Sequence, residues 1–129
     1  MKIRQLDHLV LTVTDPDRTI DFYTRILGMT AIPFGDGRLA LHFGHQKINL
    51  HVVGEEIEPH ASVPTPGSAD LCFLVEGSLD AILDHLHTEN VPVILGPVDR
   101  TGAHGPQCSI YLRDPDGNLI ELATPSPPP

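Results

Sequence analysis

Apolar and polar side chains alternate along two short stretches of the chain, residues 7–13 ("DHLVLTV") and 69–75 ("ADLCFLV"). Such alternation is typical of a β-strand, because successive side chains of a strand point to opposite faces of the sheet. Each stretch is followed by apolar residues at helical spacing, in "TDPDRTIDFYTRILGM" and in "GSLDAILDHLHTENVP". The pattern therefore predicts a strand followed by a helix in each half of the chain.

Residues typical of helix ends bound both predicted helices. Asp15 is a suitable N-cap for the first helix, and Gly28 is suited to close it. Ser78 can cap the second helix, which Asn90 and Pro92 would end. The two helices match in kind and position, which indicates an internal repeat.

Short strands separated by turn residues follow each predicted helix. They cover 29–34, 37–43 and 46–53 in the first half, and 92–98, 107–113 and 118–123 in the second half. The element order is therefore βαβββ, twice, in an α+β fold. In the second half, the glycine-rich segment 99–107 connects the first two of these strands and is expected to form a long loop.

The length of 129 residues favours one domain, residues 1–125, made of two modules. Module 1 covers 4–53 and module 2 covers 69–124, with a polar, proline-bearing linker over 54–68. The proline-rich tail 125–129 is expected to be disordered.

The alternation sorts the strand residues of both modules onto two faces. One parity is almost purely apolar and is expected to lie under the helices. The other parity is polar and is expected to contain no Lys; it collects His8, Thr12, Arg38, His42, Asn49, His51, Asp70, Cys72, Ser109, Tyr111, Arg113 and Glu121. A face of this composition is typical of a polar pocket, although a solvated sheet surface is the simpler alternative.

Charge and composition exclude several kinds of partner. Seventeen acids against eight bases give a net charge of −9, which lacks the basic surface that nucleic acids and anionic membranes require. No segment approaches the roughly 20 apolar residues of a membrane span. The two cysteines, Cys72 and Cys108, form no disulfide framework. We expect a cytoplasmic protein that binds a small molecule.

Two segments carry a resemblance to a known family: "LDHLVLTVTDPDRTIDFYTRILGM" near the start and "YLRDPDGNLIEL" near the end. They resemble the vicinal oxygen chelate superfamily, which includes glyoxalase I, bleomycin-binding proteins and extradiol dioxygenases. Within it, the chain looks similar to the small glyoxalase-domain-containing protein 5 group. The resemblance implies a U-shaped mixed sheet around a cleft, with the helices on its outer face. It also implies a homodimer, with each cleft formed within one chain or by strand exchange.

The resemblance further implies one divalent metal ion, of Zn, Ni, Mn or Fe. Carried over by position, its ligands are His8, Asp70, Glu121 and a residue of "INL" in 46–53. This sequence departs from the family at two of these places, with Asp70 where histidine is common and Asn49 where glutamate is common. Asparagine is a weak ligand for a transition metal, so His51, two residues along the same face, is the alternative to Asn49.

The remaining polar residues are candidates for binding substrate. Glu121 or Asp70 could move a proton, and Tyr111 could donate to a substrate oxygen. A substrate carboxylate could be held by Arg38, Arg100 or Arg113. His104, in the predicted loop, could belong to a lid, with a plain surface loop as the alternative.

These residues favour a small-molecule metalloenzyme of the lyase or isomerase type, in which the metal stabilises an oxyanion. Two other functions fit the same face. One is a non-catalytic protein that sequesters a drug or metabolite, and the other is an Fe(II) ring-cleaving dioxygenase. Metal content, ligand binding without turnover and oxygen uptake would separate the three.

Overall fold

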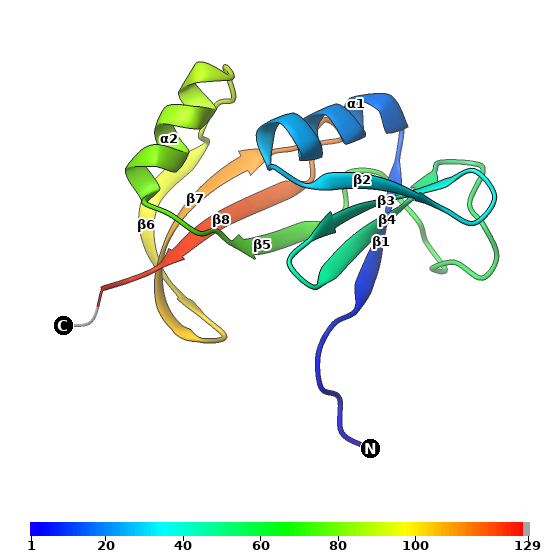
Figure 1. Ribbon diagram of the computed structural model, residues 1–129, viewed down its shortest axis with the longest axis horizontal. Coiled ribbons are helices and arrows are strands. Elements are labelled where there is room, and N and C mark those ends of the chain that lie inside the picture. Colours follow the sequence, from blue (N-terminus) through cyan, green and yellow to red (C-terminus); the bar gives the residue numbers. More distant parts are fainter. Residues whose placement is uncertain (128–129) are drawn as a thin grey trace. The chain divides into compact units, whose positions relative to one another are not determined.

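The computed structural model describes residues 1–127 and confirms an α+β fold in which the order βαβββ occurs twice (Figure 1). The first set is β1 (His8–Val13), α1 (Pro16–Asp21), the π-helix η1 (Phe22–Ile26), β2 (Thr30–Phe34), β3 (Arg38–Phe43) and β4 (Gln46–Val52). The second set is β5 (Asp70–Leu74), α2 (Leu79–Thr88), β6 (Leu95–Gly102), β7 (Gly105–Arg113) and β8 (Leu119–Pro125). The chain divides into two compact units, Met1–Gly67 and Ser68–Pro129.

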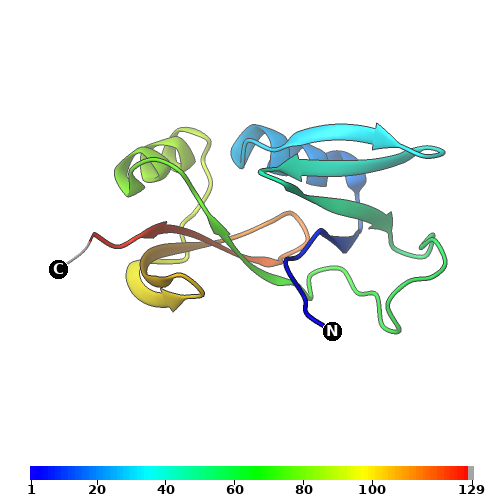
Figure 2. The ribbon, with the colours of Figure 1, turned by 60° about the horizontal axis from the view of Figure 1, so that its bottom comes forward.

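Each unit contains one four-stranded mixed sheet. The strand order is β1-β4-β3-β2 in the first, called sheet A here, and β5-β8-β7-β6 in the second, called sheet B (Figure 2). The first strand of each unit pairs in parallel with the last, and the other neighbours are antiparallel. The internal repeat is therefore present in the strand topology as well as in the sequence.

The helix caps lie where the sequence places them. Asp15 Oδ1 accepts hydrogen bonds from the backbone N–H of Asp17 at 3.0 Å and of Arg18 at 3.4 Å. Ser78 Oγ accepts one from Ala81 N–H at 3.1 Å. These bonds satisfy N–H groups that the first turn of a helix leaves without an internal partner.

The first helix differs from the prediction of one continuous α-helix. After Asp21 it widens into the π-helical turn η1, in which Phe22, Tyr23 and Ile26 are all buried. Helical spacing in the sequence does not distinguish the two, because the apolar stripe is nearly the same.

The predicted long loop 99–107 is wrong. β6 and β7 run through this segment as a hairpin, with Asp99 opposite Cys108 and Arg100 opposite Gln107, and only Ala103 and His104 form the turn. The glycines that suggested a loop instead allow the tight turn, since Gly105 has φ +117°.

The division of the strands into an apolar and a polar face is confirmed. The buried apolar strand residues all belong to the apolar parity, except Ala40 and Ala123: Leu11, Val13, Leu41, Ile48, Ile110, Leu112, Ile120 and Leu122. One detail is wrong, because the polar face does contain a lysine. Lys47 lies beside His8 on β1 and His42 on β3, so it belongs to the polar face of sheet A.

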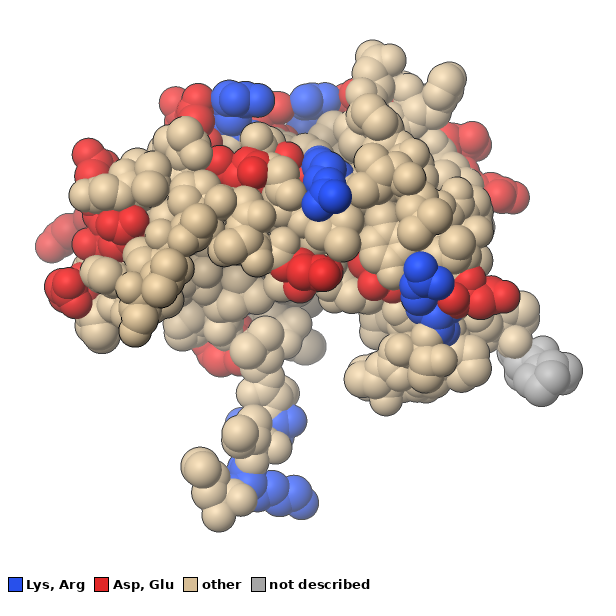
Figure 3. Space-filling model, turned by 180° about the vertical axis from the view of Figure 1, so that it is seen from behind, with Lys and Arg blue, Asp and Glu red and all other residues tan. Residues whose placement is uncertain are grey.

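The ends and the surface add three observations. Pro125 pairs with Gln107 at the end of β8, and Ser126 N–H donates to Pro106 O at 3.0 Å, so the start of the predicted tail is paired; residues 128–129 lie outside the described residues. Acidic side chains are spread over the face in Figure 3, and basic ones stand apart from one another. Among the described helices, none has the length and apolar character to cross a membrane.

Candidate functional site

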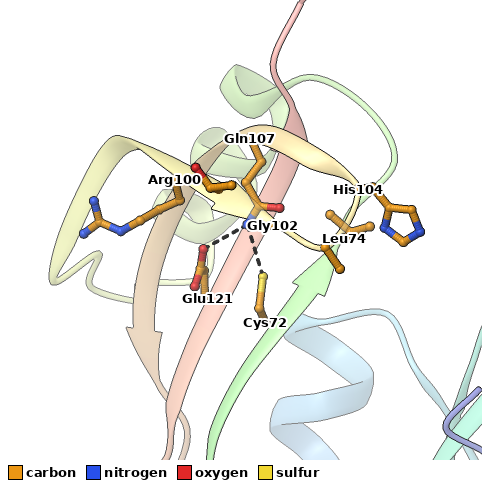
Figure 4. Close-up of a pocket in the computed structure, with 9 residues that line it drawn as sticks. Cys72, Leu74, Arg100, Gly102, His104, Gln107 and Glu121 are labelled. Atoms are coloured by element: carbon orange, nitrogen blue, oxygen red, sulfur yellow. Dashed lines mark hydrogen bonds between the residues drawn. The ribbon is translucent and has the colours of Figure 1, made fainter.

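A pocket of about 350 Å³ opens on the polar face of sheet B (Figure 4). Its floor comes from β5 and β8, where Cys72 lies opposite Glu121, and its wall from the β6–β7 hairpin. The lining residues are Cys72, Leu74, Arg100, Thr101, Gly102, Ala103, His104, Gln107 and Glu121. The pocket thus lies entirely within the second unit.

Glu121 is the carboxylate of this pocket. Its Oε2 accepts a hydrogen bond from Ser109 Oγ at 2.6 Å and one from Gln107 Nε2 at 3.1 Å. Partial burial acts to raise the pKa of Glu121, but hydrogen bonds from Ser109, Tyr111 and Gln107 outweigh it and leave the pKa below its usual value. Glu121 is therefore ionised at neutral pH and held in one orientation.

The buried side chain of Gln107 organises the pocket. Its Nε2 lies 3.1 Å from Glu121 Oε2, 3.4 Å from Ser109 Oγ and 3.5 Å from Cys72 Sγ, and Figure 4 shows the amide between Glu121 and Cys72. The side chain fits because position 102 is glycine: a Cβ there would collide with Gln107 Oε1. Gln107 and Gly102 were missed from the sequence because both fell in the supposed loop.

Arg100 and Tyr111 form a pair beside the carboxylate. Arg100 Nε donates to Tyr111 Oη at 2.9 Å, and Tyr111 lies opposite Glu121 on the neighbouring strand. Since Tyr111 Oη accepts from Arg100, its own proton is available to Glu121. This connects the exposed guanidinium of Arg100 to the carboxylate through one hydroxyl.

Other predicted residues of the second unit lie apart from this cluster. Asp70 is exposed and pairs with Leu119, so Cys72 rather than Asp70 is directly opposite Glu121. Partial desolvation, together with the charges of Glu121 and Asp70, raises the pKa of the Cys72 thiol. Arg113 donates from Nη1 to Gly117 O at 3.3 Å in the turn before β8, and it does not line the pocket; His104, at the hairpin turn, does.

The polar face of sheet A carries the candidates of the first unit, but the register places His8 opposite Lys47 and His51 opposite Thr12. His8 Nδ1 donates to Asp7 Oδ2 at 2.8 Å, so Nε2 is the ring nitrogen that Asp7 does not engage. Asn49 and His51 are each only 5% exposed. Burial, reinforced by the charge of Arg38, lowers the pKa of His51, so its imidazole is neutral at neutral pH.

Three of the predicted ligands have the chemical character that a divalent metal requires. A neutral His51, a His8 oriented by a carboxylate and an ionised Glu121 are each suited to ligation. Within residues 1–127, however, the structure shows no group of three or more His, Cys, Asp and Glu side chains close enough to hold one ion. The predicted ligands come two from each unit, so the metal site stays a prediction.

The family follows from comparison with known proteins. The Glyoxalase/Bleomycin resistance protein/Dioxygenase superfamily matches residues 5–122. The chain belongs to this superfamily. The match includes both segments that carried the resemblance and nearly all of both units, whereas the likeness to the glyoxalase-domain-containing protein 5 group stays a prediction.

Two known proteins are similar to this chain over almost its whole length. The chain is 58% identical over 124 residues to glyoxalase domain-containing protein RDO1 of Mycosarcoma maydis, covering 96% of this chain and 70% of the relative. It is 52% identical over 123 residues to virulence protein STM3117 of Salmonella typhimurium, covering 95% and 85%. The crystal structure of the Salmonella protein matches with a TM-score of 0.96, at 51% identity, over 98% of this chain and 100% of that one.

Proposed function

We propose that this superfamily member is a metal-dependent lyase or isomerase that acts on a small oxygenated metabolite. The observation that carries the proposal is Glu121, an ionised carboxylate held by Ser109 and Gln107 at the floor of a 350 Å³ pocket. The hydrogen bonds hold this partly buried carboxylate in one orientation and keep it ionised, as a general base or a metal ligand must be.

The residues of the pocket divide the work. Glu121 Oε2 is occupied by its two donors, so the other oxygen can accept a proton from the substrate or bind a metal. The single hydroxyl proton of Tyr111 goes to Glu121 in the free chain and can go to a substrate oxygen instead, and Arg100 can pair with a substrate carboxylate. A bound divalent metal would supply a Lewis acid that stabilises the oxyanion formed when the proton leaves.

The residues that would hold this metal are His8, His51, Asp70 and Glu121. His51 is preferred to Asn49 because a buried neutral imidazole binds transition metals, whereas an amide oxygen does so weakly. Asp70 and His8 are both exposed; Asp70 is offset along β5 from the position facing Glu121, and His8 faces Lys47 rather than His51.

Metal content tests the proposal. The purified chain should take up one Zn, Ni, Mn or Fe ion per site, measured by elemental analysis after dialysis. His8→Ala, His51→Ala and Glu121→Gln should each lower the metal content, whereas His87→Ala, on the exposed surface of α2, should not. Wild-type protein that stays free of all four metals under these conditions would contradict the proposal.

A non-catalytic binding protein is the second candidate. Asn49 favours it, since the buried Oδ1 of this amide has no hydrogen-bond partner and could serve a ligand better than a metal. Binding without turnover across a metabolite panel would support this function. Uptake of oxygen with a catechol and Fe(II) would instead support a ring-cleaving dioxygenase.

A further inference from the structure

Two cationic side chains share the polar face of sheet A and contact one aromatic ring. Arg38 Cζ lies 4.6 Å from the centroid of the Phe34 ring, and Lys47 Nζ lies 4.0 Å from it. Arg38 comes from β3 and Lys47 from β4, so the contact holds cations of neighbouring strands close together. Their like charges repel each other, and the ring offsets only part of that cost.

Neither cation has a carboxylate partner within residues 1–127, where no ion pair of 4.0 Å or less joins Arg38 or Lys47 to an acid. Asp7 acts on Lys47 from a longer distance, but its carboxylate is bonded to His8 at 2.8 Å. The chain has 17 acids for 8 bases, so partners are abundant elsewhere. A pair of neighbouring cations left without acids is therefore a place suited to an external anion.

Two buried polar atoms beside the cations also lack partners. They are Nε of Arg38, a donor, and Oδ1 of Asn49, an acceptor. Asn49 is 5% exposed and lies opposite the buried Ala40 of β3. Leaving such buried atoms unpaired destabilises the fold, and a ligand with one acceptor and one donor would supply the missing hydrogen bonds.

We infer that Arg38, Lys47 and Asn49 form a binding site for a small hydroxy acid. Arg38 and Lys47 hold the oxyanion, either carboxylate or phosphate, and Asn49 Oδ1 accepts a hydrogen bond from the neighbouring hydroxyl. The inference goes beyond the proposed function, because this site belongs to the first unit whereas the Glu121 pocket lies entirely within the second. The site itself lies in the first unit and needs no metal.

Calorimetric titration of the metal-free chain tests the site with three probes: malonate, hydroxymalonate and inorganic phosphate. Malonate and hydroxymalonate differ by one hydroxyl, so their ratio of affinities reports on Asn49. The wild-type chain should bind hydroxymalonate more tightly than malonate. Comparison of malonate with phosphate shows which oxyanion the cations prefer, and binding of either supports the site.

Four variants assign the residues. Arg38→Gln and Lys47→Gln should each weaken binding of all three probes by about tenfold or more, since a hydrogen bond to a charged group is lost. Asn49→Leu should abolish only the preference for hydroxymalonate. Arg18→Gln removes the same charge from the exposed surface of α1 and should bind as the wild type does.

Three results would overturn the inference. The wild type could bind none of the probes, Arg38→Gln and Lys47→Gln could bind them as tightly as the wild type does, or Arg18→Gln could lose as much affinity as these two variants. If Arg38→Gln fails to fold, as circular dichroism would show, Lys47→Gln carries the test. Metal content separates the two proposals. Lys47→Gln should lose anion binding and still take up metal. If the wild type binds the anions but takes up no metal, the proposed function is contradicted and this inference is not.

Discussion

At the scale of single residues, the pocket of the second unit depends on residues that position Glu121 without reacting themselves. Gln107 and Ser109 hold the carboxylate of Glu121, and Gly102 makes room for Gln107. Ser109 is completely buried, so its hydroxyl has Glu121 rather than water as its partner. Two substitutions test these contacts.

Gly102→Ala should destabilise the chain by about 1–3 kcal/mol, because the added methyl group overlaps Gln107 Oε1. Denaturant unfolding measures the loss. The double variant Gly102→Ala with Gln107→Ala removes the clash, so it should be less damaging than the sum of the single changes. If the losses of the two single variants simply add in the double variant, the methyl group added at position 102 does not contact Gln107.

Ser109→Ala should make the free energy of unfolding depend less on pH in the acid range. The pKa of Glu121 is lowered from 4.5 in the folded chain, so its stabilisation is present above about pH 4.5 and is lost as the pH falls through the folded-state pKa. Removing the Ser109 donor raises that pKa toward 4.5. The variant should unfold about 1–3 kcal/mol more easily at neutral pH and lose less stability on acidification.

Unfolding free energies of wild type and Ser109→Ala, measured from pH 3 to pH 7, give this comparison. Ser126→Ala, a serine outside the cluster, serves as the matched control. Parallel curves for wild type and Ser109→Ala across the acid range would show that Ser109 does not set the pKa of Glu121.

At the scale of elements, the β6–β7 hairpin decides the shape of the pocket. It carries Arg100, Gly102, His104 and Gln107, so the residues expected on a mobile lid belong instead to a paired strand wall. The pairing fixes Arg100 opposite Gln107, which places both on the polar face. A lid could open and close over the pocket, whereas this wall can only be unpaired at a cost in stability.

Gly105→Ala should loosen this hairpin, since Gly105 has φ +117°, a conformation that alanine adopts only with strain of about 1–3 kcal/mol. Amide hydrogen exchange should show protected strand residues between 99 and 108 in the wild type and faster exchange in the variant. Ala103→Gly, in the turn itself, is the control and should change the exchange little. Rapid exchange throughout this segment in the wild type would contradict the paired hairpin.

At the scale of the whole molecule, the predicted metal ligands come from both units. His8 and His51 belong to the first, and Asp70 and Glu121 to the second. We propose a homodimer, in which the ligands of one site come from one chain or from two. A two-fold symmetric dimer with shared sites makes a distinctive prediction about mixed chains.

Co-expression of His8→Ala and Glu121→Ala chains distinguishes the two arrangements. If two chains share each site, half of the random dimers are mixed and have one intact site, so about a quarter of the wild-type metal content should return. If each site lies within one chain, the mixture should bind no more metal than the separate variants. Size-exclusion chromatography establishes that dimers are present, and a monomeric wild type would contradict the homodimer.

The sequence by itself determined the element order, the helix caps and the two faces of each sheet. These follow from periodicity and from the preferences of residues such as Asp15 and Ser78, which act on their immediate neighbours. Glu121 and His51 were correctly assigned to polar faces for the same reason. Local patterns are sufficient wherever the deciding interaction spans only a few residues.

Only the tertiary structure decided which residues meet. Cys72 rather than Asp70 faces Glu121 because the parallel register of β5 and β8 places it there. Residues 99–102 form a strand because they pair with the start of β7. Gln107 hydrogen-bonds Glu121, which lies 14 positions away in the sequence. Register and pairing between distant segments depend on packing over the whole sheet, and local alternation carries no information about them.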